Sequence, residues 1–103
     1  MSIDWTLYLI TDPKLAGGRD KVIPIVQEAV RGGATVVQLR DKEASDEEVE
    51  ATARELMKVL GDVPLFINDR AEVAAKVGCH LHIGQDDMDL SQARALLGPD
   101  KLI

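Results

Sequence analysis

The chain has one cysteine, Cys79, and only one Trp, one Tyr and one Phe in 103 residues. A lone cysteine excludes an internal disulfide and fits a reducing compartment. No apolar stretch approaches the roughly 18 residues that a membrane span needs. The first residues also lack the basic segment and apolar run of a secretory signal. We therefore expect a cytoplasmic protein that makes no membrane contact.

Positive charge is also scarce, with 12 Lys and Arg against 18 Asp and Glu and a net charge of −6. Nucleic acids and anionic membranes bind basic surfaces, so neither is an expected partner. The hydrophobic fraction of 46% is enough for a globular core, and the length predicts a single domain over residues 1–103. In such an acidic chain, a local group of basic residues is informative.

Short apolar runs alternate with helical patterns along the chain. The predicted strands cover residues 7–10, 35–39, 64–67, 80–83 and 101–103, and the predicted helices cover 20–31, 45–60, 71–77 and 90–97. Ser45 and Glu48 have the spacing of a capping box at the start of the second helix. Strict alternation of this kind builds a parallel sheet, either doubly wound or closed as a (β/α)₈ barrel.

The choice between these two α/β architectures stays open at this level. Length favours the open sheet, because a barrel needs roughly 200 residues or more. Two other features favour the barrel. The loop after the first strand lacks a G-x-G-x-x-G phosphate motif, and polar residues gather after the second, third and fourth strands, as in barrel active sites.

Residues 38–42 place polar side chains on one face of an otherwise apolar strand. With the strand period of two, Gln38, Arg40 and Lys42 share a face opposite Val37 and Leu39. Burying an unpaired guanidinium beside an ammonium costs on the order of several kcal/mol, so we expect this face to open into a polar cavity. A phosphate or diphosphate suits these two cations. The alternative is a pair of solvated charges at a strand end.

Acidic residues follow the next two predicted strands. Asn68 and Asp69 follow the third strand, and Asp86 and Asp87 follow the fourth. Because parallel strands end at the same edge, Asp69 can meet Asp86 or Asp87 there. Two carboxylates beside a diphosphate describe a Mg²⁺ site. For Asp86 and for Asp89 we favour the alternative, a favourable interaction with the helix that follows.

Three further residues could carry chemistry at the fourth strand. His80 and His82 share a face, but no other soft ligand accompanies them. We interpret His82 as a packed, hydrogen-bonded residue near the pocket and Cys79 as a small core residue. The pattern does not assign a role to His80.

Four segments together resemble the thiamine-phosphate synthase family over essentially the whole chain. They are residues 7–12 (LYLITD), 38–42 (QLRDK), 66–70 (FINDR) and 82–87 (HIGQDD). The resemblance implies a TIM-barrel fold, of which this chain would be the N-terminal half: about four βα units and the start of strand five, with the C-terminal half absent. It also implies a transferase that couples hydroxymethylpyrimidine diphosphate to thiazole phosphate, giving thiamine phosphate and diphosphate.

The resemblance further implies roles for individual residues. The substrate-binding residues would be Gln38, Leu39, Arg40, Asp41, Lys42 and Asn68, and the Mg²⁺ ligands would be Asp69 and Asp87. Arg40 and Lys42 would act in catalysis by neutralising charge on the departing diphosphate, after which the thiazole nitrogen attacks the pyrimidine methylene. Without the second half of the barrel, we expect the chain alone to be inactive.

Two rival interpretations remain. A thiazole tautomerase-like paralogue would share the fold, but it typically lacks the QLR-x-K and paired Asp motifs that this chain has. A non-catalytic half-barrel, truncated or engineered, would expose two apolar edge strands, which favour pairing with another copy. We therefore expect a homo-oligomer.

Overall fold

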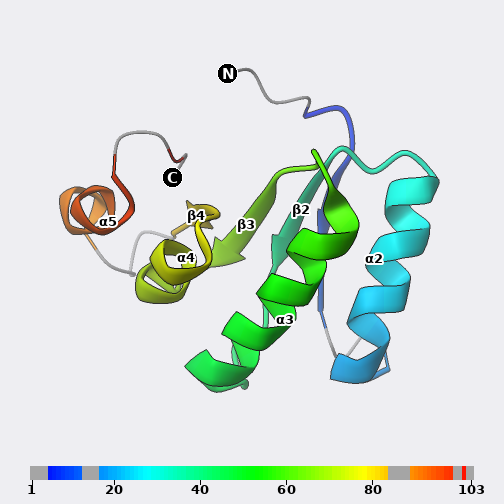
Figure 1. The fold of residues 1–103 in the computed structure, drawn as a ribbon, viewed down its shortest axis with the longest axis horizontal. Coiled ribbons are helices and arrows are strands. Elements are labelled where there is room, and N and C mark those ends of the chain that lie inside the picture. Colours follow the sequence, from blue (N-terminus) through cyan, green and yellow to red (C-terminus); the bar gives the residue numbers. More distant parts are fainter. Residues whose placement is uncertain (1–4, 13–16, 84–88, 99–100, 102–103) are drawn as a thin grey trace.

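The computed structural model describes residues 5–12, 17–83, 89–98 and 101. The strands are β1 (Tyr8–Ile10), β2 (Val36–Leu39), β3 (Leu65–Asn68) and β4 (His80–His82). The helices are the 3₁₀ turn η1 (Arg19–Lys21), α2 (Val22–Arg31), α3 (Asp46–Leu60), α4 (Ala71–Val77) and α5 (Leu90–Leu97). Strands and helices alternate as predicted (Figure 1).

The four strands form one parallel sheet in the order β1-β2-β3-β4. The helices α2, α3 and α4 lie on the same face of this sheet (Figure 1), and neighbouring helices pack on one another in sequence. A doubly wound sheet reverses its strand order and carries helices on both faces, whereas a barrel adds strands in sequence with all helices outside. The architecture is therefore a partial barrel, and the open choice from the sequence is resolved in favour of the barrel.

The hydrophobic core lies between the sheet and these helices. Alternate strand residues point into it, among them Val37, Ile67 and Leu81, all fully buried. Val26 from α2 and Leu56 from α3 meet them and are also fully buried. The spacing of apolar residues along each helix places one stripe against the sheet.

The opposite face of the sheet carries a row of aromatic rings. Trp5 contacts Tyr8 and Phe66, each at a centroid distance of 5.6 Å, and Phe66 stacks on His80 at 4.9 Å. Phe66 and His80 are buried, while Trp5 is 51% exposed. Tyr8, Phe66 and His80 occupy the alternate set of strand positions, directed away from the helices, and Trp5 precedes β1.

Local sequence signals explain most helix boundaries. The predicted capping box is present, with the Ser45 hydroxyl accepting from the Glu48 amide at 3.1 Å and the Glu48 carboxylate accepting from the Ser45 amide at 3.1 Å. Gly78 ends α4 in the left-handed region with φ 82°, which glycine adopts without a steric penalty. The first helix differs from the prediction at its start, because residues 19–21 form a 3₁₀ turn.

The predicted fifth strand is not confirmed at Lys101, which lies in a bend. The Arg94 guanidinium on α5 donates to the carbonyl of Gly98 at 3.0 Å and also to that of Lys101. These bonds connect Gly98 and Lys101 to α5. Leu102 and Ile103 lie outside the described residues.

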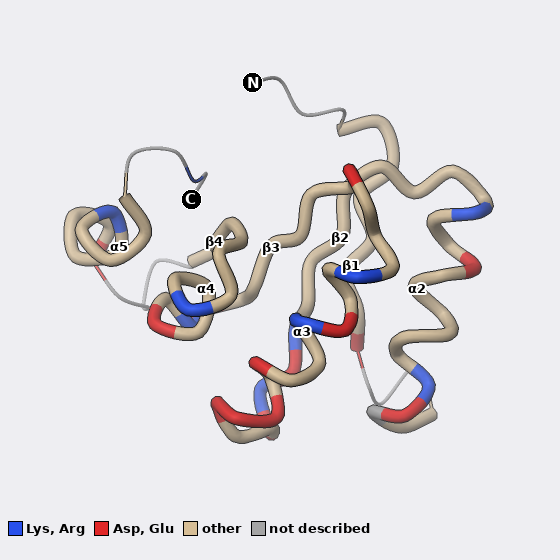
Figure 2. Tube along the Cα trace, in the orientation of Figure 1, with Lys and Arg blue, Asp and Glu red and all other residues tan. Residues whose placement is uncertain are grey.

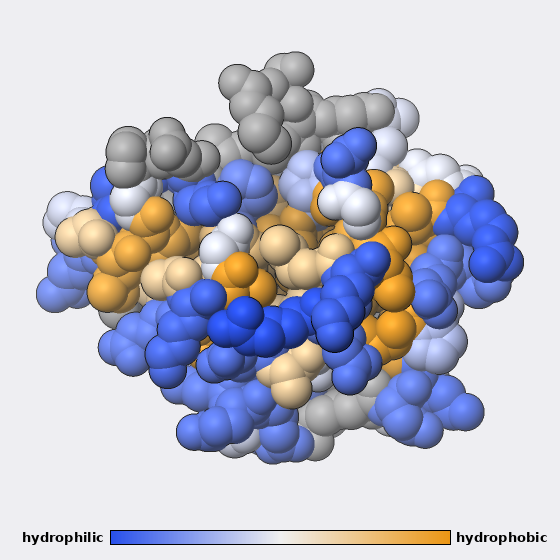
Figure 3. Space-filling view, in the orientation of Figure 1, coloured by the Kyte–Doolittle hydropathy of each residue, from blue (hydrophilic) through white to orange (hydrophobic). Residues whose placement is uncertain are grey.

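The outer surface of the helix layer is mainly hydrophilic, with scattered hydrophobic patches (Figure 3). The large hydrophobic side chains exposed on the helices are Ile25, Met57, Val59, Leu90 and Leu96. None of the helices in the described segments has the length and apolar character needed to cross a bilayer.

The interpretation of Cys79 as a small core residue is confirmed, because Cys79 is 3% exposed and belongs to the hydrophobic core. Burial raises the pKa of its thiol from 9.0 to about 12. The thiol therefore stays protonated in the folded chain over a range in which the unfolded chain ionises it.

This shift predicts how alkali affects stability. Because of the raised pKa, the folded state keeps a proton on the thiol that the unfolded state loses above pH 9.0. The contribution of this thiol to the free energy of unfolding is therefore fully present below pH 9.0 and is lost as the pH rises toward 12. Between those values, we expect the free energy of unfolding to fall up to about 1.4 kcal/mol per pH unit more steeply in the wild type than in Cys79→Ala. Urea unfolding at a series of pH values measures both slopes, and parallel curves would contradict the prediction.

Candidate functional site

The carboxyl ends of β2 and β3 lie side by side. Leu39 at the end of β2 pairs with Ile67, one residue before the end of β3. Asn68, the last residue of β3, pairs with His82, the last residue of β4. The loops that follow these strands therefore begin at one edge of the sheet, where barrel enzymes place their active sites.

A cavity of about 280 Å³ lies at this edge. The residues that line it are Asp41, Lys42, Asn68, Asp69 and Arg70. The loop between β2 and α3 contributes Asp41 and Lys42, and the end of β3 with the loop that follows it contributes the other three. In Figure 2 basic and acidic residues are interleaved around the start of α3, whose first turn carries Asp46, Glu47 and Glu48.

The polar run after β2 does not continue as a strand. The Arg40 amide donates to the Thr11 hydroxyl at 3.1 Å, and the Asp41 carboxylate accepts from the amides of Glu43 and Ala44 at 3.2 and 3.1 Å. An Asp side chain that binds the amides ahead of it makes a turn. The expected shared face of Gln38, Arg40 and Lys42 is therefore wrong beyond Leu39.

Lys42 is exposed at the cavity, while the half-buried Arg40 does not line it. The side chain of Leu39 is 3% exposed and belongs to the core, so only its backbone is near the edge of the sheet. Of the cations expected at the site, the geometry thus brings Lys42 to the cavity. Arg40 lies at the junction with β1 through Thr11.

Gln38 joins β1 to β3 through a relay of hydrogen bonds on the face opposite the helices. Its Nε2 donates to the Tyr8 hydroxyl at 2.7 Å, and its Oε1 accepts from Asn68 Nδ2 at 3.2 Å. Gln38 is 2% exposed, and both ends of its amide are used. Asn68 is thereby oriented, with its own carbonyl oxygen directed away from the Gln38 contact.

Asp69 is exposed and has φ 64°, the one positive φ among the described non-glycine residues. Asp and Asn tolerate this left-handed conformation better than other residues with a side chain. The Asp69 amide donates to the His82 carbonyl at 2.8 Å, which fixes the turn against β4. The carboxylate is thus presented at the cavity by a specific backbone conformation.

The sequence profile of the thiamine monophosphate synthase family matches residues 7–103. The chain belongs to this family. It is 50% identical to a thiamine-phosphate synthase of Azorhizobium caulinodans over 97% of this chain and 48% of that protein. It is 54% identical to the thiamine biosynthesis multifunctional protein ThiED of Corynebacterium efficiens over 91% of this chain and 13% of that protein.

A solved structure agrees with the family assignment. The thiamine phosphate pyrophosphorylase of Pyrococcus furiosus matches with a TM-score of 0.78 and 31% identity, over 87% of this chain and 44% of that one. The family resemblance drawn from the four motifs and the barrel fold are both confirmed. The chain spans about half the length of the thiamine-phosphate synthases that it matches.

The chemistry of the cavity fits the Mg²⁺ ion that the family implies. Asp69 supplies a carboxylate and Asn68 an amide oxygen, and Mg²⁺ prefers such hard ligands. The other ligand expected from the motif, Asp87, lies outside the described residues. Among the residues that are described, no group of three or more His, Cys, Asp and Glu could hold a metal ion on its own.

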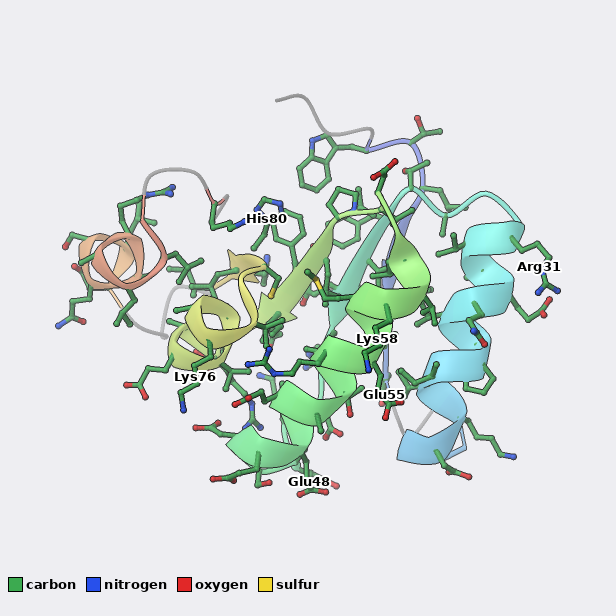
Figure 4. All side chains as sticks on the ribbon, in the orientation of Figure 1. Arg31, Glu48, Glu55, Lys58, Lys76 and His80 are labelled. Atoms are coloured by element: carbon green, nitrogen blue, oxygen red, sulfur yellow. The ribbon has the colours of Figure 1, made fainter. Side chains whose placement is uncertain are left out.

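The prediction for His82 is wrong, and no role had been predicted for His80. His82 is exposed, not packed, and its contribution to the site is the backbone carbonyl that binds the Asp69 amide. The buried one is His80, whose pKa is lowered by burial and further by the charge of Lys101. His80 starts β4 and lies toward the opposite end of the molecule from Glu48 in the first turn of α3 (Figure 4), which places it away from the cavity.

Sequence reasoning missed two residues of the site, Tyr8 and Arg70. Tyr8 orients Gln38 through a hydrogen bond, and no local sequence pattern predicts a bond between residues 30 positions apart. Arg70 did leave a signal, because it is a cation at the N-terminus of α4, where the helix dipole disfavours positive charge. Such a residue needs acceptors elsewhere, and Arg70 finds them in the β2–α3 loop.

The backbone of Asp69 predicts an order of stability among its variants. Alanine is strained at positive φ, whereas asparagine tolerates it, so Asp69→Ala should be about 1 kcal/mol less stable than Asp69→Asn. Urea unfolding of both variants measures the difference. The matched pair Asp62→Ala and Asp62→Asn, at an exposed residue without positive φ, should differ by less than about 0.5 kcal/mol. Equal differences at the two positions would contradict this account of Asp69.

Proposed function

We propose that this chain carries the diphosphate- and Mg²⁺-binding part of a thiamine-phosphate synthase and corresponds to the N-terminal half of its barrel. The full reaction would couple hydroxymethylpyrimidine diphosphate to thiazole phosphate and release diphosphate. The names of the relatives support this reaction. The observation that carries the proposal is the 280 Å³ cavity, because four of its five lining residues are ones that the family motifs assign to the site: Asp41, Lys42, Asn68 and Asp69.

In this proposal the residues bind and neutralise a leaving group. Lys42 is exposed at the cavity and can approach a phosphate oxygen as a point charge. Arg40 would need to turn toward the same anion from its place beside Thr11. Asn68, held by Gln38, can contact either the diphosphate or the metal ion with a fixed amide. No protein nucleophile is needed, because the bond to the pyrimidine methylene breaks as charge on the diphosphate is stabilised.

Asp69 and Asp87 are the residues that we propose to hold Mg²⁺. When bound, the ion would supply further neutralisation of the negative charge that develops on the departing diphosphate. Asp69 is suited to this role because its carboxylate lines the cavity and its backbone conformation is fixed by the bond to His82.

Binding of inorganic diphosphate tests the proposal without requiring turnover. By calorimetry, we expect Mg²⁺ to strengthen binding of inorganic diphosphate to this chain, and Asp69→Asn to weaken the Mg²⁺-dependent binding by about tenfold or more. Asparagine is the right substitution because it keeps the backbone conformation. The control Asp62→Asn should bind as the wild type does. Equal affinity of Asp69→Asn and wild type would contradict the proposed metal site. Thiamine phosphate formed from both precursors by the chain alone would contradict its proposed inactivity.

We also propose self-association as a second property of the chain. The edge strand β1 is only three residues long, yet Ile10 within it is 54% exposed, and Trp5 and Leu7, which precede it, are 51% and 50% exposed. An apolar edge favours pairing with a second copy.

Light scattering at micromolar concentration should therefore detect a dimer or larger species. The variant Ile10→Lys places a charge on the edge and should shift the population toward monomer. A monodisperse wild-type monomer would rule out this association.

A further inference from the structure

Arg70 occupies an unusual position between β3 and α4. It is the N-cap residue of α4, and its side chain makes no capping bond to that helix. Instead the guanidinium extends to the β2–α3 loop, and the side chain is only 19% exposed. An arginine buried to this extent needs acceptors for its donors.

The guanidinium donates hydrogen bonds to three acceptors, all in residues 41–46. Nη2 donates to the carbonyl of Asp41 at 2.9 Å and to that of Ala44 at 2.6 Å. Nη1 donates to the Asp46 carboxylate at 2.8 Å, which also forms an ion pair. Asp46 is the first residue of α3, so Arg70 joins the end of β3 to the whole loop and to the helix that follows it.

The two carbonyls that Arg70 binds lie on either side of Lys42 in the sequence. The backbone of Lys42 is therefore bracketed by bonds at Asp41 and Ala44, and its side chain leaves the loop at the cavity. The Asp41 carboxylate closes the same loop from within by accepting the amides of Glu43 and Ala44. The loop has its own turn, and Arg70 fixes that turn relative to β3.

We propose that Arg70 is a positioning residue, which sets the place of Lys42 relative to Asn68 and Asp69 so that the cation meets the same anionic ligand. The inference rests on the proposed function for the identity of that ligand, a diphosphate. Arg70 acts through Lys42, and its own guanidinium is engaged by the loop. A lysine at position 70 would keep the charge but could not span the three acceptors, because an ammonium is a point donor without a planar fork.

A double-mutant cycle with calorimetry separates positioning from direct ligand contact. The four proteins are the wild type, Arg70→Lys, Lys42→Ala and the double variant, and the probe is inorganic diphosphate with Mg²⁺. If Arg70 acts through Lys42, Arg70→Lys weakens binding about tenfold in the wild type and less than about twofold in the Lys42→Ala background. Equal losses in both backgrounds would mean that Arg70 contacts the anion itself and would overturn the proposal, as would no loss in either.

The matched control is Arg54→Lys. Arg54 also joins two elements, donating to the Glu50 carboxylate at 3.1 Å and to the Lys76 carbonyl at 3.4 Å, but it does not line the cavity. Its replacement should leave diphosphate binding unchanged. If Arg70→Lys does not fold, Asp46→Asn replaces it in the cycle, because it weakens one of the three bonds that Arg70 makes to the β2–α3 segment.

Amide hydrogen exchange provides a second readout that does not depend on the ligand. Arg70→Lys should raise exchange at the amides of Glu43 and Ala44 by about tenfold, because these amides bond to the Asp41 side chain within the loop that Arg70 anchors. Arg54→Lys should not raise it, because Arg54 bonds to Glu50 and Lys76 instead. If the wild type binds no diphosphate, the proposed function fails and the exchange result alone decides whether Arg70 positions the loop. Unchanged exchange in Arg70→Lys would overturn the positioning role.

Discussion

Parallel pairing of β2 with β3, with Leu39 opposite Ile67, is the constraint on which the site depends. It places the β2–α3 and β3–α4 loops at one edge of the sheet. The core maintains this register, because a slip by one residue would turn the buried Val37 and Leu39 away from the helices. The same slip would separate Gln38 from Asn68 and break the amide relay. Packing of apolar side chains on one face of the sheet therefore determines where Gln38 and Asn68 lie relative to each other at its edge.

Two levels of polar bonding then refine what the register provides. The relay from Tyr8 through Gln38 to Asn68 crosses three strands and orients one amide at the cavity. The hydrogen bonds of the Arg70 guanidinium connect the two loops outside the sheet. Asp69 lies between the relay and the bonds of Arg70, and the hydrogen bond from its backbone amide to the His82 carbonyl holds it in a left-handed conformation. A ligand that enters the cavity would therefore meet groups whose positions are set before it arrives, which reduces the ordering cost of binding.

The sequence predicted the elements whose signals are local. The bounds of α4 agree with the prediction, and the Ser45–Glu48 capping box is present, because periodicity and capping depend on neighbouring residues. The choice between barrel and open sheet depends on strand order, which is a long-range property that alternation alone does not settle. The motif resemblance pointed to the barrel, and the strand order and solved relative agree with it.

The candidate site divides in the same way. Asn68 and Asp69 were expected at the site because they follow the third predicted strand, and Lys42 because it was expected to share a face with Gln38 and Arg40; all three line one cavity. The expected face shared by Arg40 and Lys42 failed because the side chain of Asp41 turns the backbone, which strand periodicity does not include. Tyr8 and Arg70 escaped notice because their partners lie 24 to 30 residues away in the chain.

The most direct test of the central claim is a titration of the ¹⁵N-labelled chain with inorganic diphosphate and Mg²⁺, followed by backbone amide chemical shifts. The account predicts that the shifts concentrate at the amides of Lys42, Glu43, Asn68, Asp69 and Arg70, the two loops that meet at the cavity, while α2 is unaffected. Shifts that concentrate elsewhere, with these amides unchanged, would contradict the assignment of the anion site to the carboxyl ends of β2 and β3.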